Sequence, residues 1–353
     1  MQLYNKLSAK EREALIDEAG EERLTISFYQ YYKLGNPQIF RNHLFVAWNE
    51  LDVLGRIYVA HEGINAQLSV PANRFKEFKT HLDSITFLNG IRLNIAREQY
   101  NKSFLKLKIK VRKKILADGL NDETFDVTNK GKHLKAEEFN KLIERDDAIL
   151  IDMRNHYEHE IGHFKGAILP DVDTFRDSLP EIVDEYIKEA KEDKHIVMYC
   201  TGGIRCEKAS AYFKHLGAKN VYQLEGGIIE YARRVEEKGL ENKFLGKNFV
   251  FDDRMAERIG DEIISNCHQC GAPCDDHTNC GNVDCNLLFI QCDQCKEKME
   301  NCCSDECIEI IHLPEDEQKE RRKGKLNSNK IFKKGRSEKL KFMGKIELET
   351  DNS

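Results

Sequence analysis

The chain has 353 residues, of which 40% are hydrophobic, and it carries a formal net charge of −6. This length predicts two or three domains, and the composition supports ordinary apolar cores without favouring any particular class of partner. No apolar run is long enough to cross a bilayer, and residues 1–20 are charged and lack the apolar core of a signal peptide. We therefore expect a cytoplasmic protein that does not associate with membranes.

The first third of the chain predicts a short helix and then a β-α-β-β-α-β pattern. Residues 8–11 read Ser-Ala-Lys-Glu, which is a capping box, and Gly20 stands where the helix would end. The further expected elements are strands at 24–34, 54–59, 64–70, 87–96 and 104–111, and helices at 36–51 and from Pro71 onward. This order is typical of a ferredoxin-like sandwich. We assign residues 1–117 to this N-terminal domain.

The last of these strands alternates strictly between apolar residues and lysines. Its outward positions are Lys106, Lys108 and Lys110, and Arg112 follows. Lysines of this kind protect an edge strand against aggregation. A row of lysines also binds nucleic-acid phosphates. The strand alone supports both interpretations equally.

A second domain follows a polar linker at 118–132 that is rich in turn-forming residues. Residues 133–240 alternate strands with helices, which predicts a parallel sheet. The expected strands are 148–152, the apolar run that ends at Cys200, and 221–224; the expected helices are 137–145, 181–191, 207–216 and one after Gly227. Sites on parallel sheets lie beyond the carboxyl ends of the strands. Cys200 stands at such an end.

Residues 200–205, here called the cysteine loop, carry the strongest chemical signal in the chain. A β-prone run ends at Cys200, and two glycines, Arg205 and a helix start follow. Backbone N–H groups and a helix N-terminus favour an anion at such a turn, so we expect a lowered pKa and a partly ionised thiol. The remaining residues of the loop that would form the anion site are Thr201, Gly202, Gly203 and Ile204. The alternative is a buried, inert core cysteine.

Four sequence signatures in order make this domain resemble a rhodanese domain. They are the segments 150–154 (Leu-Ile-Asp-Met-Arg), 158–167, the cysteine loop and 224–227 (Leu-Glu-Gly-Gly). The resemblance implies that Cys200 is a catalytic thiol of the kind that carries a persulfide, and that Arg205 faces the bound anion. Asp152 and Arg154 match an early Asp-x-Arg of the family, and we interpret them as a structural ion pair. Cys206, one helical turn on, is a secondary thiol that could trap an oxidised Cys200.

Ten of the twelve cysteines fall between residues 267 and 307. Cys267-x-x-Cys270 and Cys292-x-x-Cys295 are spaced like the ligands of a tetrahedral structural zinc site. Six further cysteines could complete a second site: Cys274, Cys280, Cys285, Cys302, Cys303 and Cys307. Disulfides and an iron–sulfur cluster are the alternatives. We assign residues 241–312 to a connector and this cysteine-rich module, which metal binding would stabilise.

The C-terminal tail, residues 313–353, is strongly basic. Between residues 319 and 345 twelve Lys or Arg residues stand against two Glu, a net charge of +10. Such a run is commonly only solvated and disordered, but next to a zinc module it also favours contact with nucleic acid.

The complete domain order is similar to that of the bacterial tRNA uridine hydroxylase family, whose members contain a rhodanese domain. The most specific matching stretches are 55–67, 199–210 and 267–274. The resemblance implies an oxidoreductase of class EC 1.14 that uses molecular oxygen to convert uridine 34, the wobble residue of the tRNA anticodon loop, to 5-hydroxyuridine. The sequence has no flavin or nicotinamide motif and indicates no protein partner.

Two other functions remain open at this point. A plain interpretation of the cysteine loop is a thiosulfate-type sulfurtransferase that carries a cysteine persulfide. A non-enzymatic RNA-binding protein is the third possibility, although the intact Cys200 and Arg205 argue against it.

Overall fold

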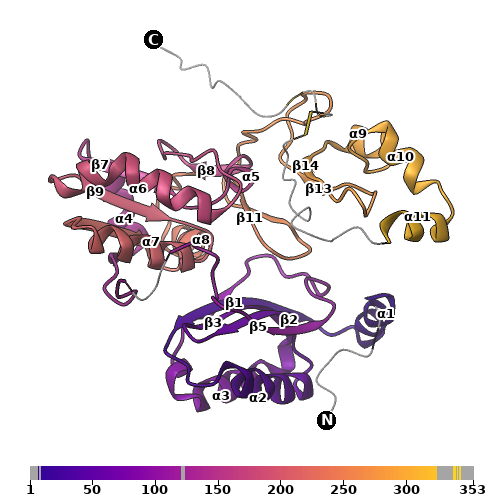
Figure 1. Cartoon of the computed structure of the whole chain (residues 1–353), viewed down its shortest axis with the longest axis horizontal. Coiled ribbons are helices and arrows are strands. Elements are labelled where there is room, and N and C mark those ends of the chain that lie inside the picture. The colour runs from indigo at the N-terminus through magenta and orange to yellow at the C-terminus, as the bar shows by residue number, and fades with distance from the viewer. Residues whose placement is uncertain are drawn as a thin grey trace. The chain divides into compact units, whose positions relative to one another are not determined.

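The computed structural model describes residues 7, 9–120, 124–323, 337, 338, 340 and 342 (Figure 1). They divide into two compact units. The first holds the described residues within 1–155, 166–242 and 250–257, and the second holds those within 156–165, 243–249 and 258–353. Of the basic tail, the residues from 324 onward, apart from the four positions named above, lie outside the described residues. None of the described helices is long and apolar enough to cross a membrane.

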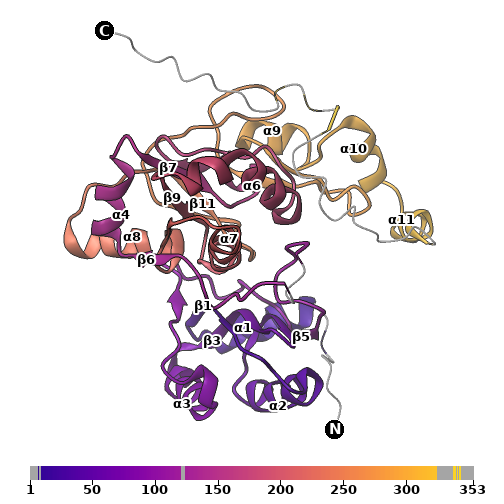
Figure 2. The same cartoon turned by 60° about the vertical axis from the view of Figure 1, so that its left-hand side comes forward.

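The N-terminal part of the first unit is a five-stranded sheet with helices on one face (Figures 1 and 2). Its elements in chain order are α1 (Ala9–Ala19), β1 (Arg23–Tyr31), α2 (Pro37–Glu50), β2 (Leu54–Ala60), β3 (Gly63–Pro71), α3 (Phe75–Ser84), β4 (Asn94–Ile95) and β5 (Leu107–Val111). The strand order is β4-β1-β3-β2-β5, in which β5 runs parallel to β2. The first four strands have the ferredoxin-like order, and β5 adds an edge. The expected ferredoxin-like domain is confirmed.

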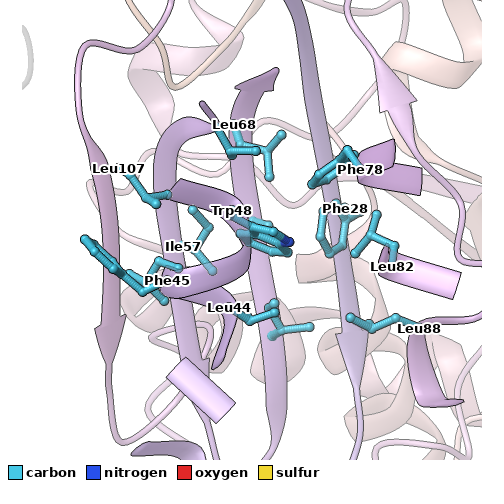
Figure 3. Close-up of a cluster of buried hydrophobic side chains, with 14 of the residues drawn as sticks. Phe28, Leu44, Phe45, Trp48, Ile57, Leu68, Phe78, Leu82, Leu88 and Leu107 are labelled. Atoms are coloured by element: carbon cyan, nitrogen blue, oxygen red, sulfur yellow. The ribbon is translucent and has the colours of Figure 1, made fainter. Parts of the chain in front are cut away.

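The core of this sheet lies between its strands and helices α2 and α3. Helix α2 begins because Asn36 accepts a hydrogen bond from the N–H of Ile39 and Pro37 occupies the first turn. Its Trp48 is fully buried and packs edge-on against Phe28 and beside Phe78 (Figure 3). Burial of such large aromatic side chains provides much of the stabilisation of a small domain. The opposite face of the sheet is left for other contacts.

The expected strand at 87–96 is wrong over most of its length, and the strand expected at 104–111 begins only at Leu107. Residues Thr86–Leu88 form a 3-10 turn, and only β4 pairs with β1. The reason is a turn at Asn89–Gly90. Gly90 has a φ of +69°, and its N–H and the Asn89 side chain both bond to Asp83. This turn replaces a strand hydrogen-bond ladder with local contacts.

The remainder of the first unit is built on a four-stranded parallel sheet of order β6-β10-β9-β7. Its elements are β6 (Lys132–Leu134), α4 (Ala136–Ile143), β7 (Ala148–Asp152), α6 (Phe175–Lys191), β9 (His195–Tyr199), α7 (Ile204–His215), β10 (Asn220–Leu224) and α8 (Gly227–Lys238). Helix α6 begins six residues before the expected Glu181, because Thr174 caps it and Pro180 is accommodated inside. Strand β9 lies between two neighbours, so Cys200 follows an interior strand. Rhodanese-like architecture is thereby confirmed.

The second unit holds the cysteine-rich segment. Its elements are α5 (His156–His159), β8 (Gly162–Phe164), β11 (Phe244–Phe249), β13 (His277–Asn279), β14 (Leu288–Ile290), α9 (Asp293–Lys298), α10 (Asp305–Ile311) and α11 (Glu315–Arg322); β12 (Ala256–Arg258) lies where the chain enters this unit. Its core cluster consists largely of cysteines, with Leu287, Phe289 and Leu340. A core of this kind needs an additional source of stability.

Candidate active site and metal-binding clusters

The cysteine loop holds the Cys200 sulfur close to backbone N–H groups. Strand β9 ends at Tyr199 and α7 begins at Ile204, so the loop makes its turn within four residues. Gly203 stands at the helix N-cap with a φ of +101°, which favours glycine, and its N–H donates to Cys200 Sγ at 3.1 Å. Cys200 is only 1% exposed. The loop is therefore a preformed site for a negatively charged sulfur.

The electrostatics of the loop favour a thiolate at Cys200. Burial raises the pKa of this thiol, but the Cys206 thiol, the charge of Arg205 and the N–H groups of Cys206 and Arg205 outweigh it and lower the pKa to about 6. Burial and the neighbouring thiolate raise the pKa of Cys206 well above its ordinary value. The two thiols therefore differ in charge near neutral pH, and Cys200 is the nucleophilic one.

Arg205 lies against the loop as expected. Its side chain is largely buried, its guanidinium is 3.5 Å from the Thr201 hydroxyl, and it lies 5.9 Å from the centre of the Phe251 ring. The positive charge is thus held beside the sulfur by both a polar and an aromatic neighbour.

The glycine pair at the start of α8 supports the loop from behind. The N–H of Ile228 donates to the Cys200 carbonyl at 3.0 Å. Gly227 has a φ of +68°, and a side chain there would meet the carbonyl oxygens of Cys200 and Thr201 at 2.5 and 2.6 Å. Glycine is required at this position because the two loops touch through their backbones.

Asp152 and Arg154 form a fully buried ion pair, as the sequence predicted. The guanidinium of Arg154 donates to both carboxylate oxygens of Asp152, at 2.6 to 3.1 Å. The intervening Met153 donates its N–H to the Tyr199 carbonyl, directly before Cys200. The pair therefore fixes the backbone next to the loop.

Tyr29 of strand β1 lies against the cysteine loop, which sequence reasoning did not anticipate. Its hydroxyl donates to Glu207 at 3.1 Å and would be 2.8 Å from a side chain at Gly203. Glu207 also pairs with Lys130 at 2.7 Å and His133 at 3.0 Å. The N-terminal sheet therefore contributes directly to the surroundings of the loop, through residues too far apart in sequence for any spacing to connect.

A buried charge network joins helix α7 to the N-terminal sheet. Lys208 is fully buried, and its ammonium lies 2.7 Å from Glu62 and 2.9 Å from Asp118. Glu62 also accepts from the N–H of Ile115. Glu62 and Lys208 belong to two of the three stretches that match the family most specifically, but their spacing in the sequence gave no reason to pair them. Asp118, the first residue of the expected linker, is part of this network.

A cavity of about 460 Å³ lies beside the cysteine loop. It is lined by strand β1, the turn before β4, the segment 127–133 and the glycines of both loops; its polar lining residues include Tyr29, Tyr31, Arg92, Asn94, Lys130, His133, Glu207 and Glu225. Gly202, rather than Cys200 itself, forms the wall on the loop side. A ligand in this cavity would therefore contact the cysteine loop at Gly202.

The expected basic strand is the edge strand β5, and it belongs to a wider positive cluster. Lys108, Lys110 and Arg112 are exposed, and Lys106 is half-buried. Arg56 of β2 pairs in register with Lys108. The pKa of Lys108 is lowered, mainly by burial and also by the neighbouring positive charges of Arg56, Lys110 and Lys106. Protection of an edge explains lysines on β5, but it does not explain a like charge on the interior strand β2.

The structure brings eight of the ten C-terminal cysteines into two sets of four. The first cysteine cluster is Cys267, Cys270, Cys292 and Cys295, and the second cysteine cluster is Cys280, Cys285, Cys303 and Cys307. The first set matches the two Cys-x-x-Cys pairs expected to share a zinc ion. Cys274 and Cys302 are in neither set. Sulfur–sulfur distances are 3.6 Å for Cys270–Cys292 and 3.6 and 3.8 Å for two pairs of the second cluster.

These distances suit a tetrahedral metal ion. Four sulfurs about 2.3 Å from a central zinc lie about 3.8 Å apart. The histidines of the module, His268 and His277, are not in either set. His268 instead bonds to Glu160 at 2.8 Å and accepts from the N–H of Ile290. It therefore holds strand β14, which leads into Cys292 and Cys295 of the first cysteine cluster.

Three family models match successive parts of this chain, and curated relatives match nearly all of it. Residues 23–115 match the UPF0176 acylphosphatase-like domain, residues 135–234 match the rhodanese-like domain, and residues 245–308 match the rhodanase C-terminal domain. The tRNA uridine(34) hydroxylase of Leptospira interrogans is 55% identical over 95% of this chain and 90% of its own length. That of Photorhabdus laumondii is 54% identical over 95% of each chain. The chain belongs to the tRNA uridine(34) hydroxylase family.

In this member of the hydroxylase family, the residue ranges matched by the family models contain the sites described above. The rhodanese-like match contains the cysteine loop and both its supporting segments, and the C-terminal match contains both cysteine clusters. Among solved structures, a rhodanese-related protein of Thermoplasma volcanium covers 30% of this chain and 93% of its own, at 24% identity and a TM-score of 0.23.

Proposed function

We propose that this chain hydroxylates uridine 34 of tRNA to 5-hydroxyuridine, with molecular oxygen as co-substrate and Cys200 as the catalytic thiol. The reaction is inferred from the name of its relatives, tRNA uridine(34) hydroxylase. The observation that carries the proposal is the Cys200 thiol, whose pKa is lowered to about 6 in a loop that borders a cavity of nucleoside size. Such an enzyme is an oxidoreductase of class EC 1.14.

A thiolate can activate uracil by addition. Carbon C5 of the resting ring is a poor nucleophile. When Cys200 Sγ bonds to C6, the electron pair of the C5–C6 double bond moves toward C5 and O4, and C5 becomes the nucleophile that takes up one oxygen atom of O2. Loss of the C5 proton then expels the thiolate from C6 and restores the double bond. The second oxygen atom leaves as water, which requires two electrons from an external reductant. Covalent addition divides one difficult step into two easier ones. Arg205 and the loop N–H groups keep Cys200 ionised before addition.

The competing role is that Cys200 carries the oxygen itself, as a sulfenate or a persulfide-derived oxidant. The neighbouring thiol of Cys206 would then act on the oxidised sulfur. Loss of Cys200 abolishes both routes, so substitution cannot separate them. A tRNA with 5-fluorouridine at position 34 can: addition at C6 leaves a covalent adduct on Cys200 that survives denaturation, whereas the carrier route leaves an oxidised Cys200 and no adduct.

For the RNA we propose the positive cluster at the sheet edge: Arg56 with Lys106, Lys108, Lys110 and Arg112. These residues face away from helices α2 and α3, on the face of the sheet that also carries Tyr29. The cross-strand row Lys108–Arg56–Gln67–Ser27–Asn94 leads from the edge strand to the cavity. Five strands span about 19 Å, which suits a few nucleotides of a single-stranded loop whose bases can turn outward. The anticodon loop is such a substrate.

For the metal we propose one structural zinc ion in each cysteine cluster. All-thiolate sites are closed and leave no coordination position for substrate, so this zinc would stabilise the second unit rather than take part in the reaction. Eight thiols held for metal fit a reducing compartment, and we accordingly place the protein in the cytoplasm with its tRNA.

The direct test is to incubate purified protein with unmodified tRNA and oxygen and to analyse the nucleosides by mass spectrometry. The proposal requires 5-hydroxyuridine that maps to position 34 and depends on oxygen. A sulfurtransferase would instead move sulfur from thiosulfate without RNA, and an RNA-binding protein would leave the nucleosides unchanged.

A further inference from the structure

The cavity beside the cysteine loop contains a polar group that the protein does not use. Asn94 stands on β4, opposite Ser27 of β1, so its side chain points to the face of the sheet that carries Tyr29 and Tyr31. It lines the cavity and is 7% exposed. Its amide nitrogen lies 3.5 Å from where a side chain at Gly202 would begin. The amide is thus two residues along the loop from the catalytic sulfur.

The Asn94 Oδ1 atom is buried and has no hydrogen-bond partner among the described residues. The hydroxyl of Tyr31, which lines the same cavity, is also buried and also has no hydrogen-bond partner among the described residues. A buried polar atom without a partner costs stability, and native structures contain few of them. Two such atoms at one cavity, next to a nucleophile, indicate that a polar ligand forms the missing hydrogen bonds.

The cavity has the size and chemistry for one nucleoside. Its volume of about 460 Å³ falls within the range of about 300–1,000 Å³ common for small-molecule sites. Tyr29, Tyr31 and Phe87 provide aromatic surface for a base. The charged lining residues are balanced, because Lys130 pairs with Glu207 and Arg92 pairs with Glu225.

We propose that Asn94 recognises the target base by its imide edge. Uracil presents the N3–H donor between two carbonyl acceptors, and a carboxamide offers one acceptor and one donor side by side. Oδ1 of Asn94 accepts from N3–H, and its NH₂ group donates to the adjacent carbonyl. This inference rests on the proposed function, because it takes the uridine of that reaction as the ligand.

Recognition of this kind excludes bases that lack the N3 donor. A site built to hydrogen-bond a substrate group rejects an analogue without it, because its own polar atoms are then left unpaired. Asn94 is therefore a specificity-determining residue, distinct from the phosphate contacts, which hold any tRNA loop equally.

The test compares binding of two anticodon stem-loop RNAs that differ only at position 34, one with uridine and one with 3-methyluridine, which has no N3–H. Equilibrium binding to the full-length chain is measured by fluorescence anisotropy. We expect the wild-type protein to bind the methylated RNA about tenfold more weakly or worse. In Asn94→Ala this ratio should fall below about twofold, because the partner of N3–H is gone. Asn94→Asp keeps the size but lacks the donor, and it should bind the uridine RNA more weakly than wild type.

Asn89→Ala is the matched control. Asn89 lines the same cavity, but its side chain is exposed and already donates to the Asp83 carbonyl. It should retain the wild-type ratio. Equal affinity of wild type for the two RNAs, or an undiminished ratio in Asn94→Ala, overturns the inference. Because only binding is measured, an Asn94-dependent ratio in a protein that forms no 5-hydroxyuridine supports Asn94 and refutes the proposed reaction.

Discussion

The ammonium of Lys208, in the second turn of α7, lies 2.7 Å from the carboxylate of Glu62 in the turn between β2 and β3. The two residues are 146 positions apart in the chain. Because α7 begins at the cysteine loop, this contact fixes the N-terminal sheet against the element that carries the loop. The Lys208–Glu62 contact therefore links the sheet face that we propose for RNA binding to the thiol that we propose for the reaction.

Replacement of Lys208 by alanine should destabilise the first unit strongly. The substitution leaves the Glu62 carboxylate without its cation and removes one of the two lysines that pair with buried Asp118, the other being Lys114 at 2.6 Å. Breaking buried ion pairs costs about 3–5 kcal/mol. Urea unfolding measures the loss. Lys219→Ala, at an exposed position, should change the free energy of unfolding by less than about 0.5 kcal/mol. Similar small effects for both variants would show that the network does not hold the unit together.

Arg205 should set the pH dependence of the reaction. The Cys200 pKa is lowered to about 6, so the thiolate is present above that pH and activity should fall as the pH drops through it. Arg205→Gln removes a charge that lowers the pKa, so the midpoint should move upward toward the ordinary thiol value. The measurement is single-turnover formation of 5-hydroxyuridine between pH 5 and 9, with the exposed Arg176→Gln as control. An unshifted midpoint would remove Arg205 from this role.

Charge reversal at Lys108 and Lys110 should weaken tRNA binding and reduce its dependence on salt. Each phosphate contact that is lost lowers the slope of log affinity against log salt by about 1. Lys76→Glu is the matched control, because Lys76 is exposed on α3, on the helix side of the same sheet. If the double variant binds with unchanged affinity and slope, these lysines only protect the edge strand.

Elemental analysis of protein purified without added metal should find two zinc ions per chain. Cys267→Ala and Cys280→Ala should each lose one, since each removes a ligand from a different cluster. Cys274→Ala and Cys302→Ala should lose none, because neither residue is in a cluster. Loss of metal should also lower the stability of the second unit. Iron with visible absorption, or one ion shared by both sets, would contradict the assignment.

The cysteine loop could be predicted from the sequence because its geometry is local. An apolar strand, two glycines and a helix start determine where Cys200 and Arg205 lie, and the structure shows both there. The turn at Asn89–Gly90 is equally local, but the apolar residues around it gave a stronger strand pattern, and a strand was expected wrongly.

The rest of the site depends on contacts between distant segments. Tyr29 meets Glu207 across 178 positions, and Asn94 reaches the cavity through pairing of a two-residue strand. No periodicity or spacing encodes either contact. The second cysteine cluster shows the same limit: Cys302 and Cys303 are adjacent in sequence, and only the fold determines that Cys303 joins Cys307.

The most direct test of the central claim is the modification assay with Cys200→Ala and Cys206→Ala side by side, on tRNA under oxygen with nucleoside mass spectrometry. Both variants should keep the wild-type unfolding midpoint within a few degrees. Cys200→Ala should form no 5-hydroxyuridine, while Cys206→Ala should retain measurable activity with a raised pH midpoint, because its thiol helps to lower the Cys200 pKa. Full activity in Cys200→Ala would contradict the account.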